Sequence, residues 1–359
     1  MASLTRLLGS RLRLTLTALF AVGFGCLGVA RAAELQGVKD PQRDAYYKAF
    51  KDKLVVFVPV FMGLDLTEGW SALMANQAAA LGYTYQVQNA NFSTSAGTQI
   101  LTSLINAKRK PDVIVVQNPD ITSYTRLEKE AEQKGIYVIQ MNMHSLYRTT
   151  GFVGADAVRI GELQADAVVK QCGAGTNTSH EVLILIGPAT SPYSVYLQTG
   201  YKNVLSKHPD IKIVGVQSTG NYEATKAKQI TQITLQQHPK LCGIISIWDV
   251  TDSGTAAAIK DAGMQGKVYL STSGGGSEVN ACRNIENGNF QNYISYDVYR
   301  QGLAVNDQIR MALQEKADGV KAGTTHTYLY TPLQVLSKDT IKTHPCWSLD
   351  QIRKESTRY

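Results

Sequence analysis

Short apolar runs alternate with segments of helical periodicity along most of the chain, and this alternation constrains the fold more than any other feature. Leu54–Val58 is a continuous apolar run of the kind found in buried strands. The next segment predicts a helix ending at Gly82, because its apolar residues fall on one face: Trp70, Leu73, Met74, Ala78 and Leu81. Further strands are predicted at residues 84–88, 112–117 and 136–141, with helices at residues 96–108 and 123–134. This order predicts an open parallel sheet covered by helices on both faces.

The same alternation repeats in the second half of the chain, after a stretch that contains Gly151 and Gly154. It begins with a predicted helix at residues 156–170 and closes with a helix at 299–316 and a strand at 329–336. Between them, strands are predicted at residues 182–186, 211–216, 243–248, 267–270 and 292–296, and helices at residues 193–206, 224–237, 254–262 and 278–287. The sequence therefore predicts an α/β protein with two successive Rossmann-like lobes.

The first 32 residues differ from the rest of the chain. Arg6, Arg11 and Arg13 are followed by an apolar stretch that ends at residue 27, and Ala30-Arg31-Ala32 has the small residues of a cleavage site. This is the pattern of a secretory signal peptide over residues 1–32, and it predicts export to the periplasm. A membrane anchor is the alternative, although the apolar stretch is short for a bilayer span.

The formal net charge of +7 does not indicate nucleic acid as a partner. Cleavage after Ala32 would remove four arginines and no acidic residue, so much of the excess charge belongs to the predicted signal peptide. The remaining Lys and Arg residues are scattered, with no run that interleaves aromatic side chains.

Four cysteines remain in the predicted mature chain: Cys172, Cys242, Cys282 and Cys346. An even number in an oxidising compartment predicts two disulfides, for which three pairings are possible. None of the four lies in a C-x-x-C pair, and no histidine stands at ligand spacing beside one. We therefore expect neither a zinc site nor another cofactor.

The sequence carries no motif of a common catalytic site: a nucleophile elbow, a P-loop and an H-E-x-x-H motif are all absent. Gly274-Gly275-Gly276-Ser277 is typical of a tight strand-to-helix turn, with an anion site on its backbone N–H groups as the alternative. Asp249 and Asp252 form a carboxylate pair, yet a helix begins there and Asp252 or Ser253 suits its N-cap. These features predict a binding protein rather than an enzyme.

Aromatic and short polar side chains follow the predicted strands in both halves of the chain. They are Phe61, Met62, Asp65, Thr67, Gln117, Asn118 and Asn142 in the first half, and Tyr193, Ser194, Trp248, Asp249, Ser273, Tyr296 and Asp297 in the second. Parallel sheets present their ligand-binding loops at the carboxyl ends of the strands, so two lobes facing each other there would form a cleft. Aromatic rings can pack on the apolar faces of a small polar molecule, and short polar side chains can bind its hydroxyl groups.

The chain also shows a series of soft motifs in a fixed order. They are Leu54–Val60, Ala80-Leu81-Gly82-Tyr83, Lys110-Pro111-Asp112-Val113-Ile114-Val115, Gly135-Ile136-Tyr137-Val138-Ile139, Val153-Gly154-Ala155-Asp156, His238-Pro239, Trp248-Asp249, Gly254 through Ala262-Gly263, and Arg300-Gln301-Gly302. Together they resemble the type I periplasmic binding proteins, specifically the ribose-binding-like, sugar-binding branch. The resemblance covers nearly the whole predicted mature chain.

The resemblance implies two lobes joined by a three-strand hinge. The N-terminal lobe would comprise residues 46–154 plus 297–335, and the C-terminal lobe residues 155–296 plus 336–359. In the strand order of this family, the strands that follow Cys172 and Cys242 are neighbours, which favours a Cys172–Cys242 disulfide. A Cys282–Cys346 disulfide would then staple down a tail that extends beyond the usual end of the family.

The resemblance also places the ligand between the lobes. The predicted ligand-binding residues are Phe61, Asp65, Thr67, Asn142, Tyr193, Trp248, Asp249, Ser273 and Tyr296. Asn142 and Ser273 stand where sugar binders usually have Asp. Met143 replaces a common Arg, and Trp248 replaces a usual Asn. The chain therefore has fewer of the charged side chains that usually bind sugar hydroxyls in this family, which favours a less hydroxylated or more apolar ligand than an ordinary aldose.

We therefore expect a monomeric, periplasmic solute-binding component of an ABC importer. It would bind a small sugar-like or polyol-like ligand by hinge closure and deliver it to an inner-membrane permease. The alternative is a sensory binding protein that presents its ligand to a histidine kinase or chemoreceptor, since Asn142, Asp249 and the glycine turn are similar to the autoinducer-2 receptor branch. An exported hydrolase is a third hypothesis, without a visible nucleophile–base pair.

Overall fold

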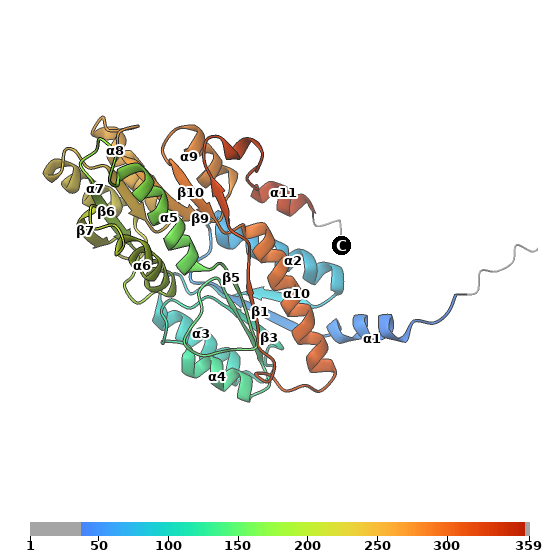
Figure 1. The fold of residues 1–359 in the computed structure, drawn as a ribbon. Helices are drawn as coiled ribbons and strands as arrows, with labels where there is room; N and C mark the ends of the chain where they lie inside the picture. Colours follow the sequence, from blue (N-terminus) through green and yellow to red (C-terminus); the bar gives the residue numbers. More distant parts are fainter. Residues whose placement is uncertain (1–36, 356–359) are drawn as a thin grey trace, which may run out of the picture. The chain divides into compact units, whose positions relative to one another are not determined.

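Two six-stranded sheets, each flanked by helices, organise the part of the chain that the structure describes (Figure 1). The structure is a computed structural model and describes residues 37–355, so the predicted signal peptide lies outside the described residues. Residues 42–355 belong to one compact unit that holds both sheets. The strand orders are β11-β5-β4-β3-β1-β2 and β12-β10-β9-β8-β6-β7. Every pairing is parallel except that of β10 with β12.

The first sheet and the helices between its strands are called the first lobe here. Its elements are β1 (Leu54–Val58), α2 (Asp65–Leu81), β2 (Thr84–Val87), α3 (Thr94–Asn106), β3 (Val113–Val116), α4 (Thr125–Gln133), β4 (Tyr137–Met141), β5 (Gly151–Gly154), α10 (Val298–Ala317) and β11 (Thr327–Tyr330). A helix α1 (Pro41–Phe50) precedes β1 in the chain. Strands β1, β3 and β4 are buried along their whole length, as expected for a parallel sheet covered on both faces.

The second sheet and its helices are called the second lobe. Its elements are α5 (Ala157–Cys172), β6 (Glu181–Ile186), α6 (Pro192–Leu205), β7 (Lys212–Ser218), α7 (Ala224–Gln237), β8 (Gly243–Ser246), α8 (Asp249–Asp261), β9 (Tyr269–Gly274), a π-helical turn (Glu278–Cys282), α9 (Arg283–Glu286), β10 (Asn292–Ser295) and β12 (Gln334–Leu336). A 3₁₀ turn (Thr340–Lys342) and α11 (Leu349–Lys354) follow β12. The chain passes between the sheets after β5, β10 and β11, and the predicted two-lobed fold with three connections is confirmed.

Several elements differ from their predicted form. Helix α8 begins at Asp249, before its predicted start at residue 254, so Asp252 and Ser253 lie inside the helix and its N-cap is Trp248. The strand expected at residues 329–336 is two strands in different sheets, because Pro332 between them lacks an N–H group and cannot continue a ladder. The stretch around Gly151 and Gly154 is itself a buried strand, β5, whose apolar run of Phe152 and Val153 is too short to signal one. Strand β9 was expected to end at residue 270 but continues to Gly274, through buried hydroxyl side chains that resemble a loop in sequence.

Two disulfides form, and they are the predicted ones. Cys172 at the end of α5 joins Cys242 just before β8, within the second lobe. Cys282 joins Cys346, which ties the tail after β12 to the π-helical turn. None of the helices within residues 37–355 combines the length and the apolar character that a bilayer span requires.

Candidate functional site

A cavity lies where the carboxyl ends of the strands of both sheets meet. It encloses about 480 Å³ between its atoms, its open mouth included, which is within the usual size of small-molecule sites. Its lining is Val60, Phe61, Leu64, Leu66, Thr67, Phe92, Gln117, Asn142 and Met143 from the first lobe, and Tyr193, Tyr222, Trp248 and Tyr296 from the second lobe and its connections. Most of these residues lie in the segments that connect the carboxyl end of a strand to the next element, which is why residues distant in sequence meet here.

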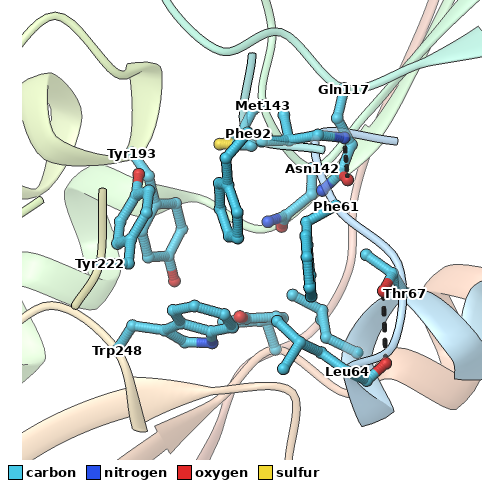
Figure 2. Close-up of a pocket in the computed structure, with 13 residues that line it drawn as sticks. Phe61, Leu64, Thr67, Phe92, Gln117, Asn142, Met143, Tyr193, Tyr222 and Trp248 are labelled. Carbon is cyan, nitrogen blue, oxygen red and sulfur yellow. Dashed lines mark hydrogen bonds between the residues drawn. The ribbon is translucent and has the colours of Figure 1, made fainter. Parts of the chain in front are cut away.

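Six of the thirteen residues that line the cavity are aromatic (Figure 2). Phe61 and Phe92 stack with their centroids 4.6 Å apart and their planes at 18°. Two pairs from the second lobe meet edge to face: Tyr222 with Trp248 at 5.6 Å, and Tyr193 with Tyr296 at 5.9 Å. Such walls present apolar faces and ring edges to a flat ligand.

Polar groups of the first lobe close one side of the cavity. Gln117 Oε1 accepts a hydrogen bond from the Val60 N–H at 3.2 Å, and Thr67 Oγ1 donates to the Leu64 carbonyl at 3.3 Å (Figure 2). Asn142 Oδ1 accepts from Gln301 Nε2 at 3.5 Å. These bonds hold the two amide side chains in place at the cavity wall.

Three of the lining residues adopt left-handed backbone conformations that non-glycine residues rarely use. The φ angles are 57° at Phe92, 60° at Asn142 and 62° at Tyr222. Each such residue costs about 1–3 kcal/mol, so the surrounding structure must impose the conformation. All three follow a strand that ends at the cavity: β2, β4 and β7. Strain gathered at one cavity is typical of a functional site.

Six of the nine residues predicted to bind a ligand line the cavity: Phe61, Thr67, Asn142, Tyr193, Trp248 and Tyr296. The other three lie outside the lining. Asp65, at the start of α2, accepts hydrogen bonds from Ser277 Oγ at 2.9 Å and Asn280 Nδ2 at 3.4 Å. Ser273 lies inside β9 and donates to the Ile247 carbonyl at 2.7 Å.

Asp249 is buried behind the cavity and bonds to the protein itself. Its Oδ2 accepts from the Tyr293 hydroxyl at 2.6 Å, and its Oδ1 accepts from the Val250 N–H at 2.7 Å. The Tyr293 oxygen in turn accepts from the Gly276 N–H at 2.9 Å. Burial raises the pKa of the Asp249 carboxyl to about 7, although the bond from Tyr293 lowers it. These hydrogen bonds connect α8 to the Gly274–Ser277 turn. They also occupy the N–H group of Gly276, which an anion bound at this turn would need.

Phe92 and Tyr222 were missed by the sequence argument. Each is preceded by Asn and followed by the N-cap residue of the next helix, at Ser93 and Glu223. The repetition of this Asn-aromatic pair after the second strand of each lobe is the signal that could have found them. Within residues 37–355, no group of three or more acidic, His or Cys side chains is arranged to hold a metal ion.

The comparisons with known proteins agree with this geometry. The family described as "Periplasmic binding protein domain" matches residues 55–317. The D-apiose import binding protein of Actinobacillus succinogenes is 21% identical over 187 residues, 52% of this chain and 59% of that protein, so the chain spans little more than half of this relative's length. The xylitol-binding protein of Mycolicibacterium smegmatis is 25% identical over 268 residues, 72% of each chain.

A solved structure shares the fold. A galactofuranose binding protein, 19% identical, superposes with a TM-score of 0.71 over 85% of this chain and 99% of that one. The likeness supports the architecture of two sheets of mainly parallel strands flanked by helices. Since the family match also covers most of the sequence, the chain belongs to the periplasmic binding protein family, with the type I fold.

Proposed function

We propose that this protein is the periplasmic solute-binding component of an ABC importer, and that it binds a small sugar-like or polyol-like molecule between its lobes. The observation that carries the proposal is the cavity itself, because both lobes contribute side chains to one lining. A ligand held there contacts both lobes and therefore favours their closed arrangement. The named relatives bind apiose and xylitol, which supports a ligand of this size.

The proposal has three further parts that the family membership supports. Residues 1–32 direct export and are removed, and the mature chain acts in the periplasm as a monomer. The lobes, predicted as residues 46–154 plus 297–335 and residues 155–296 plus 336–359, move about the three connections. The closed form is recognised by an inner-membrane permease, and the role is binding without catalysis.

A thermal-shift screen tests the proposal. The purified protein is heated with pentoses, hexoses, polyols, cyclitols and short furanones, each at high concentration. A ligand at 100 times its Kd stabilises the folded state by about 2.7 kcal/mol, which raises the Tm of a chain of this size by about 4 °C. Trp248→Ala should abolish the shift because the indole forms part of the cavity wall. Ile233→Ala, on the exposed face of α7, is the control and should keep it. The absence of a shift with every class would contradict the proposal.

A further inference from the structure

The cavity offers a ligand hydrogen-bond donors but few acceptors. Its thirteen lining residues include no Asp, Glu, Lys, Arg or His. The amide oxygens of Gln117 and Asn142 already accept bonds from Val60 and Gln301. Within residues 37–355, the NH₂ groups of these two amides donate no hydrogen bond, so they are free for a ligand.

The hydroxyl groups of the lining are also engaged. The Tyr222 hydroxyl lies 2.6 Å from Ser191 Oγ, and the Tyr193 hydroxyl lies 3.4 Å from Ser273 Oγ. Since Ser273 gives its own proton to the Ile247 carbonyl, Tyr193 is the donor in that pair. A ligand hydroxyl buried here would find as side-chain acceptors only phenolic oxygens and the second lone pair of each amide oxygen, and a hydroxyl proton left without a partner weakens binding.

From this imbalance we infer that the preferred ligand is an uncharged ring compound that accepts hydrogen bonds and donates few. A cyclic ketone, lactone or ether with at most one or two hydroxyls fits this class. Its polar edge would meet the NH₂ groups of Gln117 and Asn142, and its apolar faces would meet the rings of Phe61, Phe92 and Trp248. The inference rests on the proposed function and narrows its ligand class.

A series of six-membered carbon rings tests this inference by isothermal titration: cyclohexanone, cis-1,2-cyclohexanediol and myo-inositol. We expect the ketone and the diol to bind at least tenfold more tightly than inositol. The isosteric variant Asn142→Asp supplies an acceptor at the cavity wall and should reverse the order. Tighter binding of inositol by the wild type would overturn the inference and leave the proposed function standing. No binding by any of the three would overturn the inference alone, because the pentoses and hexoses of the thermal-shift screen test the proposed function.

A second feature, independent of the ligand, is the tail that follows β12. The family match ends at residue 317, so this tail lies outside it. The tail is fixed to the second lobe by the Cys282–Cys346 disulfide and by a β-bridge between Ser277 and Trp347. Trp347 Nε1 donates to the Gly275 carbonyl at 2.7 Å, and the Trp347 carbonyl accepts from the Glu278 N–H at 2.8 Å.

The same tail ends on the first lobe. Helix α11 packs against α2, beside which it lies in Figure 1. The Asn76 side chain on α2 donates to the Ile352 carbonyl at 3.1 Å, and Ile352 is 1% exposed. Tyr299 on α10 donates to Glu355 at 2.8 Å. The Trp347 ring approaches α2 so closely that a Cβ at Gly69 would lie 3.0 Å from its Cη2.

We propose that residues 337–355 form a strap that holds the two lobes in the closed arrangement. Opening the cleft must separate α2 from the turn after β9, yet the strap is attached to both. One attachment is covalent, so opening requires α11 and Trp347 to leave α2. The Asp65 bonds to Ser277 and Asn280 lie between the same two elements and oppose the same movement. The proposal concerns the opening of the proposed binding site and holds whatever the ligand is.

Small-angle X-ray scattering without ligand tests the strap. The wild type should show a radius of gyration near the roughly 20 Å of a compact chain of its size. The Cys282→Ala/Cys346→Ala variant, and a Cys282→Ala chain truncated after Lys338, should both show a larger value. The control is Cys172→Ala/Cys242→Ala, which removes a disulfide of similar loop length within one lobe, with separations of 70 and 64 residues. Circular dichroism checks that each variant is folded.

The outcomes separate the strap from a general loss of structure. Expansion of the two strap variants alone supports the proposal. An unchanged radius in both strap variants overturns it, because the lobes would then stay closed without the strap. Equal expansion of the control variant also overturns it, because loosening would then follow from the loss of any disulfide.

Discussion

Asp249→Asn is expected to gain stability relative to the wild type as the pH rises from about 4 to about 7, by on the order of 4 kcal/mol across that window. Asp249 is 4% exposed, and burial raises the pKa of its carboxyl from 3.8 to about 7 in the folded protein. The wild type must therefore bury a charge at neutral pH, whereas the Asn side chain carries none.

The direction follows from the protons bound in each state. In the unfolded chain the carboxyl loses its proton near its ordinary pKa of about 3.9, while the folded chain keeps it up to a pKa of about 7. Between these values the folded state binds more protons, so the free energy of unfolding falls with rising pH, by up to about 1.4 kcal/mol per unit. Burial also raises the pKa of Asp252 to about 6. Asp252 is present in both proteins and its charge helps to raise the pKa of Asp249, so the difference between variant and wild type reports Asp249 beside this neighbour.

Urea denaturation at a series of pH values between 4 and 8 measures this difference. Asp350→Asn, on the exposed side of α11, is the control and should give a curve parallel to that of the wild type. At pH 4 the Asn variant should be the less stable, because the amide cannot reproduce both the bond from Tyr293 and the bond from Val250. Parallel curves for Asp249→Asn and the wild type would show that this carboxyl does not titrate within the window.

The position of Asp249 after a strand can be predicted from the sequence, and the structure has Asp249 at the start of α8, shortly after β8. Which way the side chain turns depends on Tyr293, which comes from β10 and is 44 residues away in sequence. Local patterns carry no information about such a partner, so the sequence alone does not predict that Asp249 bonds to Tyr293 and thereby connects α8 to the Gly274–Ser277 turn.

The order of the elements could be predicted because helical and strand periodicities are local properties of the sequence. Polar residues in a buried strand are not recognised in this way. Ser271, Thr272 and Ser273 resemble a loop, yet all three are buried in β9. Thr272 donates to Asp252, and Asn292 donates to Ser271 at 2.8 Å, so their polar groups are satisfied by other elements. This is why Ser273 was expected at the cavity.

The aromatic wall was found in part, for a related reason. Trp248 and Tyr296 follow apolar strands that the pattern identifies, so their position could be inferred. Phe92 and Tyr222 follow the edge strands β2 and β7, which the sequence also predicts, but they lie farther beyond the strand ends at Val87 and Ser218 than Trp248 and Tyr296 lie beyond theirs. Alignment of the two halves of the sequence with each other reveals both residues, because the same Asn-aromatic pair follows the second strand of each half.

Removing the Cys172–Cys242 disulfide is expected to lower the free energy of unfolding by about 4 kcal/mol, because the bridge closes a loop of 70 residues in the unfolded chain. For a chain of this size that corresponds to a fall in Tm of about 6 °C. Cys172 is fully buried and Cys242 is 4% exposed, so Cys172→Ala/Cys242→Ala also leaves a small gap in the core beneath Gly243.

The Cys282→Ala/Cys346→Ala variant separates these two contributions. Its loop has a separation of 64 residues, so the loss of loop entropy is almost the same, but Cys346 is only partly buried. Urea denaturation of both variants should therefore show the larger loss for the Cys172–Cys242 pair, with the excess due to the core. Equal losses of unfolding free energy in the two variants would mean that each disulfide stabilises the protein only by restricting the unfolded chain. A Cys172→Ala/Cys242→Ala midpoint equal to that of the wild type would mean that the bridge between α5 and β8 does not form in the purified protein.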